Sequence, residues 1–259
     1  MKQNLELPES FEKYRAVLQE TLKECVHIHT EKASTGTFDS KFGGSPYFPK
    51  EETYPVDEKD KPMRLLAQIN FEQVPQLKNY PETGILQFYL SPFDGYFGCS
   101  FGRSIEQKNY RVIFFDKIER DEAKLLSDFS FTRTEEGLFP LKGEGKLTFT
   151  KGTQIITAND FRFEPLLGLE DKYELEEDLE EYFEMFDSFS HVIGGYPDFV
   201  QDDPRENRHP EHTELLLQID SDNTVDIMWG DCGMANFFIS LEDLKKKDFS
   251  KVLYNWDCS

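Results

Sequence analysis

The sequence predicts an α+β fold that is rich in β-structure, with a mainly antiparallel sheet and an internal duplication of a helix–turn–strand-meander unit in a pseudo-twofold arrangement. The first observation is that predicted helices are separated from runs of predicted strands. The second is a phrase that occurs twice, at 43–46, 65–70 and 84–91 and again at 194–197, 215–220 and 233–240. Each copy holds a Gly-Gly-x-Pro turn, a Leu-Leu-x-Gln-Ile segment and a Gly-led aromatic strand. Recurrence at nearly constant spacing indicates duplication.

The duplication predicts one compact unit over residues 1–259 that consists of two fused repeats. The first repeat covers about 8–165 with its core at 43–91, and the second covers about 170–259 with its core at 194–240. Insertions between 92 and 165 make the first repeat longer. At 259 residues the chain is long enough to bury a substantial core.

Local patterns predict the individual elements in order. Apolar residues three and four apart over 8–25 predict an amphipathic helix that begins near Pro8, and the charged, proline-rich stretch 49–62 predicts a surface loop. A second helix is expected at 170–187, where ten of eighteen residues are acidic. Runs rich in apolar residues predict strands at 64–71, 84–91, 110–116, 214–220, 224–229, 234–240 and 251–256, and a hairpin of 146–150 with 153–157 through Lys151-Gly152.

The net charge of −21, from 50 acidic and 29 basic residues, restricts the partners. Such a field repels phosphate backbones and anionic lipid, so neither nucleic acid nor membrane is an expected partner, and a basic protein is favoured. The four cysteines are far apart and residues 2–24 are polar throughout, without an apolar leader. We therefore expect a soluble, cytoplasmic protein.

The two Gln-containing strands supply the first candidate site residues. Alternation places Gln68 and Asn70 on one face of the first strand, and Gln218 and Asp220 on the matching face of the second. One interpretation is that the glutamines bond to neighbouring loop backbone, since a buried amide needs partners. The alternative is a polar cleft between the repeats in which these side chains converge on a ligand.

The segment 229–233 supplies Trp229 and Asp231, and it has no counterpart in the first repeat. It reads either as a Gly-Asp turn above a packed tryptophan or as a site with a stacking platform and an acid. Elsewhere no catalytic motif is found, and no cofactor or metal is predicted. His209 and His212 have chelating spacing, but Pro210 between them argues against a regular helix.

The residues of the repeat also carry a family resemblance. Segments 41–46, 66–69, 215–221, 229–233 and 238–240 resemble the YwqG family, and the likeness covers nearly the whole chain. This family is a domain of unknown function, so the resemblance implies a soluble cytoplasmic protein and transfers no catalytic residue.

Two function hypotheses follow. The first is a non-enzymatic binding protein for a basic protein partner, such as a toxin or a nucleic-acid-binding protein that it neutralises in the manner of an immunity protein. The second is a small-molecule-binding protein or enzyme with a polar site at the seam between the repeats. The absence of a catalytic motif favours the first, and oligomeric state is not predicted.

Overall fold

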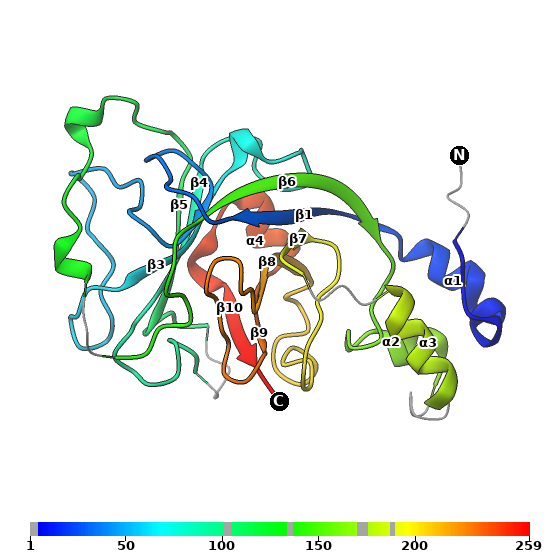
Figure 1. The fold of residues 1–259 in the computed structure, drawn as a ribbon. Coiled ribbons are helices and arrows are strands. Elements are labelled where there is room, and N and C mark those ends of the chain that lie inside the picture. The colour runs from blue at the N-terminus through cyan, green and yellow to red at the C-terminus, as the bar shows by residue number, and fades with distance from the viewer. Residues whose placement is uncertain (1–4, 101–104, 134–136, 170–175, 187–189) are drawn as a thin grey trace.

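The computed structural model describes residues 5–100, 105–133, 137–169, 176–186 and 190–259, and one ten-stranded sheet dominates it (Figure 1). Its order is β10-β9-β8-β7-β1-β6-β2-β3-β4-β5, and every pairing is antiparallel. The strands are β1 (Lys23–Glu31), β2 (Lys41–Phe42), β3 (Arg64–Asn70), β4 (Ile85–Leu90), β5 (Tyr110–Phe115), β6 (Gly145–Gln154), β7 (Val192–Gly194), β8 (Glu214–Asp220), β9 (Met234–Ile239) and β10 (Leu253–Asp257).

The sheet curls into a nearly closed barrel, because its two end strands approach each other. The rings of Tyr110 on β5 and Tyr254 on β10 lie 5.2 Å apart, and the Tyr110 hydroxyl donates a 2.7 Å hydrogen bond to the Val252 carbonyl. Helices contribute only short segments beside this barrel. The prediction of an α+β fold made of helix–turn–strand-meander units is therefore wrong: the fold is a sheet-dominated barrel.

Helices from the two predicted repeats contact one another. Among the described residues the α-helices are α1 (Arg15–Glu20), α2 (Phe163–Leu167), α3 (Glu176–Phe186) and α4 (Leu241–Lys246). Phe11, just before α1, lies 4.6 Å from the ring of Tyr182 on α3, and Phe163 on α2 lies 5.2 Å from the same ring. The helices from both predicted repeats thus pack on one another beside the barrel (Figure 1), around a separate apolar cluster.

The predicted helix 8–25 ends early. A 3₁₀ helix (Glu9–Tyr14) and α1 occupy its first part, but residues from Lys23 onward form β1, which pairs with β6 over nine residues. The predicted hairpin at 146–157 is also wrong, because β6 runs unbroken through Gly152. A Cβ on Gly152 would lie 2.6 Å from Nε2 of His27 on β1, so this glycine permits close cross-strand packing and marks no turn.

Two further expectations change in the C-terminal part. Residues 224–229 form a turn and no strand, although Ile227 makes isolated bridges to Leu141 and Asp222. The predicted acidic helix 170–187 corresponds to α3 (Glu176–Phe186), while 170–175 and 187 lie outside the described residues. The predicted strands that correspond to β3, β4, β5, β8, β9 and β10 are present.

The two copies of the repeated phrase take matching places in the barrel. The first copy supplies β3 and β4, and the second supplies β8 and β9. With their flanking strands they form the blocks β2 to β5 and β7 to β10, which are bordered by the long central strands β6 and β1, respectively. Both Gly-Gly turns have positive φ, between 65° and 71°, which is the conformation that glycine adopts without strain. The pairing register shifts at the same point of each copy, between Leu65 and Ala67 and between Leu215 and Leu217. A shared origin by duplication stays a prediction.

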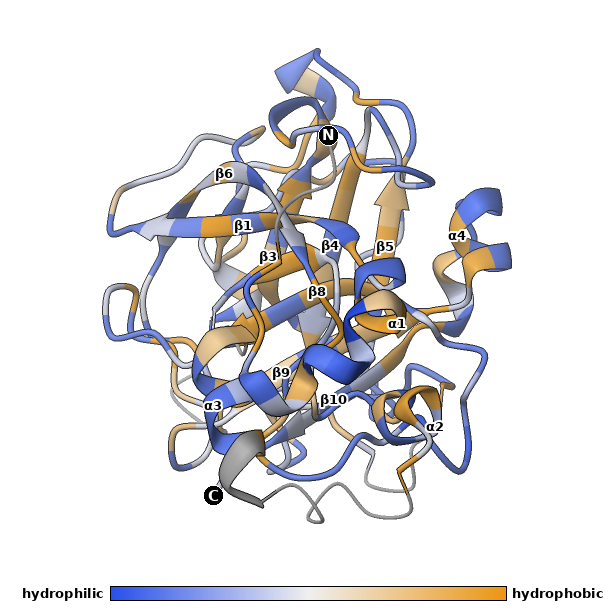
Figure 2. Cartoon of the chain, turned by 90° about the vertical axis from the view of Figure 1, so that its right-hand side faces the viewer, coloured by the Kyte–Doolittle hydropathy of each residue, from blue (hydrophilic) through white to orange (hydrophobic). Residues whose placement is uncertain are grey.

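The barrel interior is apolar where the copies meet. Phe88 on β4 and Phe237 on β9, which hold equivalent places in the two copies, lie 4.7 Å apart between ring centroids and are fully buried. In Figure 2 apolar residues are prominent on strands such as β5, whereas β1 and β6 carry many polar residues and the loops are largely polar. Aromatic packing therefore occupies the interior between the copies.

Candidate functional site

Gln68 and Asn70 hold the loop that precedes β2 and the turn that follows it. The Gln68 Nε2 donates hydrogen bonds to the carbonyls of Thr37 (2.9 Å) and Asp39 (2.8 Å), and its Oε1 accepts one from the Tyr47 N–H at 2.8 Å. Asn70 donates to the Phe38 carbonyl at 2.9 Å. Both side chains are buried, so these bonds offset the cost of removing their amides from water.

Gln218 makes the same kind of contact in the second copy. Its Oε1 accepts from the Asp198 N–H at 2.8 Å, and its Nε2 donates to the Ser190 carbonyl at 3.0 Å. Tyr47 and Asp198 each directly follow a Gly-Gly-x-Pro turn, so the two glutamines are equivalent. Each bonds to the loop of its own copy, and the structure does not bring Gln68 and Gln218 together.

Asp220 and Trp229 lie near each other, while Asp231 is separate. The Ser221 N–H donates to an Asp220 carboxylate oxygen at 2.8 Å, and the Trp229 N–H donates to the Ser221 hydroxyl at 3.1 Å. Burial raises the pKa of Asp220, although the Ser221 N–H and His191 act against it. The Trp229 ring is fully buried, and its Nε1 has no hydrogen-bond acceptor among the described residues. Asp231 is exposed on the turn.

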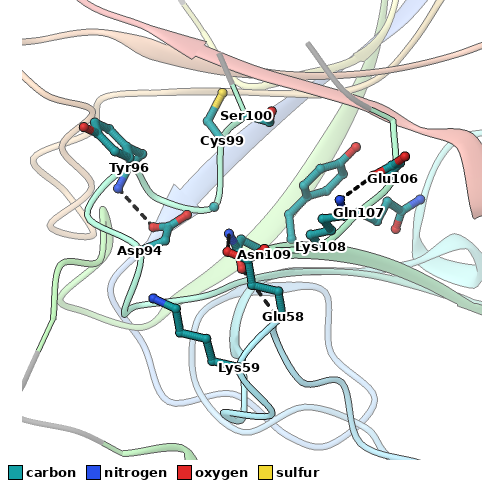
Figure 3. Close-up of a pocket in the computed structure, with 12 residues that line it drawn as sticks. Glu58, Lys59, Asp94, Tyr96, Cys99, Ser100, Glu106, Gln107, Lys108 and Asn109 are labelled. Atoms are coloured by element: carbon teal, nitrogen blue, oxygen red, sulfur yellow. Dashed lines mark hydrogen bonds and ion pairs between the residues drawn. The ribbon is translucent and has the colours of Figure 1, made fainter. Parts of the chain in front are cut away.

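One surface hollow, of about 400 Å³, lies beside the loops that join β4 to β5 (Figure 3). Two of its charged residues pair with each other, since Lys108 contacts Glu106 at 2.7 Å, and Asn109 donates a hydrogen bond to Glu58 at 3.2 Å. Cys99 also lines it, but burial raises the pKa of this thiol to about 12, which keeps it protonated. A protonated thiol is a poor nucleophile, so the hollow lacks the activated cysteine of covalent catalysis.

A second hollow, also about 400 Å³, lies between α2 and the loop after β7, and its wall is mainly polar and acidic. Glu164, Asp202 and Glu206 line it, and none of these three makes an ion pair with any described residue. Asp202 and Glu206 are exposed, and Glu164 is half-buried. Within the part of the chain that the structure describes, the hollow therefore presents three carboxylates that have no ion-pair partner. We call it the acidic hollow.

A buried ion network forms the floor of the acidic hollow. The guanidinium of Arg205 is fully buried and donates to Asp203 at 2.6 Å and to Asp160 at 2.9 Å, while Arg162 donates to Asp160 at 2.7 and 2.6 Å. Burial opposes ionisation of Asp160, but the two arginines outweigh it and keep the pKa of this carboxyl below its usual value. Two carboxylates and two guanidiniums balance, so the network is neutral as a unit.

Sequence reasoning did not identify this region. Asp160 lies within the insertion of the first copy, and Arg205 lies in a charged, proline-containing loop that resembles ordinary solvated surface. The spacing of Asp203 and Arg205 was the one local signal, since residues two apart across a turn can pair. On the same loop, His209, Glu211 and His212 form the one group with metal-ligand spacing among the described residues.

Comparison with known proteins places the chain in a family without assigning it an activity. The family model described as "Domain of unknown function (DUF1963)" matches residues 40–258 and so covers both copies of the repeated phrase. No curated protein matches the chain. No helix among the described residues combines the length and apolarity needed to cross a membrane. The narrower likeness to YwqG stays a prediction, and the chain is a member of the domain-of-unknown-function family DUF1963.

Proposed function

We propose that this protein binds a basic protein partner without catalysing a reaction, and that the acidic hollow receives a Lys or Arg side chain of that partner. The observation that carries the proposal is the group of carboxylates on Glu164, Asp202 and Glu206, which lack a cationic partner among the described residues. Carboxylates accept charge-assisted hydrogen bonds from guanidinium or ammonium groups, and these are stronger than neutral ones.

The surroundings of the hollow support this proposal. Helix α3 packs against α2 through Tyr182 and Phe163, and it carries three further exposed carboxylates, on Glu180, Glu181 and Glu184. The buried Arg205 network holds the loop that carries Asp202 and Glu206, which lowers the ordering cost of binding. The net charge of −21 adds long-range attraction for a basic partner. A toxin neutralised by this protein is one such partner.

We place this activity in the cytoplasm. None of the four cysteines forms a disulfide: Cys25, Cys99, Cys232 and Cys258 are all free thiols. Free thiols are typical of a reducing compartment, which supports this location.

A small-molecule site near Trp229 is the second candidate. One observation favours it: the buried Nε1 of Trp229 has no acceptor among the described residues, and a bound ligand oxygen would satisfy it. A ligand that raises the melting temperature of the wild type but not of Trp229→Phe, which removes the Nε1 donor, would support this candidate.

The test of the proposed function compares two charge-reversed variants with the same net charge. Asp202→Lys/Glu206→Lys alters the acidic hollow, and Glu51→Lys/Glu52→Lys alters exposed acids outside it. Each variant changes the net charge from −21 to −17, since two substitutions replace −1 by +1. The probe is a labelled nona-arginine peptide, followed by fluorescence anisotropy at low and at physiological ionic strength.

We expect salt-sensitive binding to the wild type, a loss of ten-fold or more in the Asp202/Glu206 variant, and a much smaller loss in the Glu51/Glu52 variant. Equal losses in both variants would mean that net charge alone attracts the peptide, and the proposal would fail. Absence of binding to the wild type at low ionic strength would refute it as well.

A further inference from the structure

The segment after the acidic hollow gathers two imidazoles and a carboxylate on one turn. The backbone N–H of His209 donates to the Arg205 carbonyl at 3.0 Å, and the backbone N–H of His212 donates to the His209 carbonyl at 3.0 Å. This turn directs His209, Glu211 and His212 toward one another, with one ligand atom of each within 4.8 Å of the others. The turn forms despite Pro210, which lacks an N–H but needs none here.

The tautomer of the neutral His212 ring follows from its contact with Lys251, which lies just before β10. Its Nε2 lies 2.7 Å from the Lys251 carbonyl oxygen, which can only accept, so Nε2 carries a hydrogen. In the neutral ring Nδ1 then holds a lone pair, and this atom lies 3.1 Å from Oε1 of Glu211. Two lone pairs that face each other at this distance repel unless a cation or a proton lies between them. The His212 side chain is buried, which limits the access of water to this contact.

The distances from the Glu211 carboxylate to the two imidazoles are close to those between ligands of a zinc-type ion. Metal–nitrogen and metal–oxygen bonds of about 2.0–2.2 Å in tetrahedral geometry separate neighbouring ligands by about 3.3–3.5 Å. The Glu211 carboxylate oxygen lies 3.1 Å from Nδ1 of His212 and 3.4 Å from Nδ1 of His209. The Lys251 carbonyl supplies the orienting hydrogen bond that metal-ligating histidines commonly make through their other nitrogen.

We propose that His209, Glu211 and His212 bind one zinc-type divalent cation through the Nδ1 atoms of both rings and a carboxylate oxygen, with the fourth position open to solvent. Arg205 approaches the His212 carbonyl at 3.4 Å, but its charge is committed to Asp203 and Asp160. Glu211 is exposed, which gives the ion a path from solvent. The site is separate from the proposed partner-binding function.

The experiment titrates the untagged full chain with Zn²⁺, by calorimetry, and with Co²⁺, by visible absorption. The test variants are His209→Ala and Glu211→Gln, since both side chains lie toward the surface and their loss leaves the His212–Lys251 bond in place. The control is His29→Ala, an exposed histidine on β1 whose ring contacts Thr150. Melting temperature, measured with and without Zn²⁺, provides a second readout.

We expect one equivalent of metal, a Co²⁺ spectrum typical of four-coordinate geometry, and a Zn²⁺-dependent rise in melting temperature. Each test variant should weaken binding ten-fold or more and abolish that rise, while His29→Ala should behave like the wild type. Equal affinity in wild type and test variants would overturn the proposal. An absence of stoichiometric metal binding to the wild type would overturn it as well.

Discussion

Replacing Arg205 by Met tests whether the buried ion network holds the loop that carries the acidic hollow. Met keeps most of the side-chain volume and the contact with the Phe238 ring, which the guanidinium carbon faces at 4.3 Å. It removes the hydrogen bonds to Asp203 at 2.9 and 2.6 Å and the bond to Asp160 at 2.9 Å. Asp160 keeps Arg162, but Asp203 loses its only ion-pair partner among the described residues.

The expected loss in the free energy of unfolding is about 3–5 kcal/mol, which is typical when one member of a buried ion pair is removed. The double variant Arg205→Met/Asp203→Asn should recover part of this loss, because it also removes the unpaired charge. Urea unfolding at pH 7 measures the stability of both variants. With an unchanged slope of the free energy against urea concentration, the shift of the midpoint gives the change in stability. Arg162→Met is the control and should cost less, because its side chain is 31% exposed and Asp160 keeps Arg205.

The pH dependence gives an independent check. Because the folded-state pKa of Asp160 is lowered, its ionisation stabilises the fold above the unfolded value of 3.8, and this contribution is lost as the pH falls. The difference in the free energy of unfolding between wild type and Arg205→Met should therefore become smaller below about pH 4. A loss under about 1 kcal/mol at pH 7 would refute the reasoning, since it would mean that the network contributes no more than a surface ion pair.

Three further predictions concern other buried groups. Gln68→Leu and Gln218→Leu should each cost about 1–3 kcal/mol in urea unfolding, because each leaves a backbone N–H unbonded after a Gly-Gly-x-Pro turn; a neutral effect would contradict this. Burial lowers the pKa of Lys41 to about 8 against 10.5 unfolded, so the unfolded chain binds more protons between these values. The stability of wild type relative to Lys41→Met should rise across that window by the order of 3 kcal/mol, and a flat difference would contradict it. At pH 8, Ellman's reagent should react rapidly with exposed Cys232 and with Cys99 only on unfolding; rapid loss of both would contradict the burial of Cys99.

The repeated phrase predicted much of the sheet because its signals are local. Strands β3, β4, β8 and β9 contain short apolar runs bounded by turn residues, and such runs form strands wherever they pack. The strand β1 was missed because Leu18, Leu22 and Cys25 continue a helical spacing by coincidence, while pairing with the distant β6 determines the outcome. Gly152 was read as a turn because the neighbour that requires a glycine, His27, is 125 positions away (27 to 152).

The candidate site was harder to predict for the same physical reason. Sequence reasoning identified the buried amides of Gln68 and Gln218, and one of its two interpretations, bonding to loop backbone, matches the contacts. It could not identify Asp160 and Arg205 as partners, because 45 residues separate them and only the fold joins them. The histidines of the 209–212 turn were noticed, but the Lys251 carbonyl that sets their tautomer is 39 residues away.

The pairing of β1 with β7, which lies far along the chain, has a consequence for synthesis on the ribosome. Strand β1 emerges early, yet its partner β7 begins at residue 192, about 160 residues after β1 ends at 31. At roughly 5–20 residues per second this wait lasts roughly 10–30 s. An unpaired strand edge invites association with other chains, and charged residues discourage it. Lys23, Glu24 and Glu31 carry such charges at the two ends of β1, so the nascent strand is protected until the last third of the chain arrives.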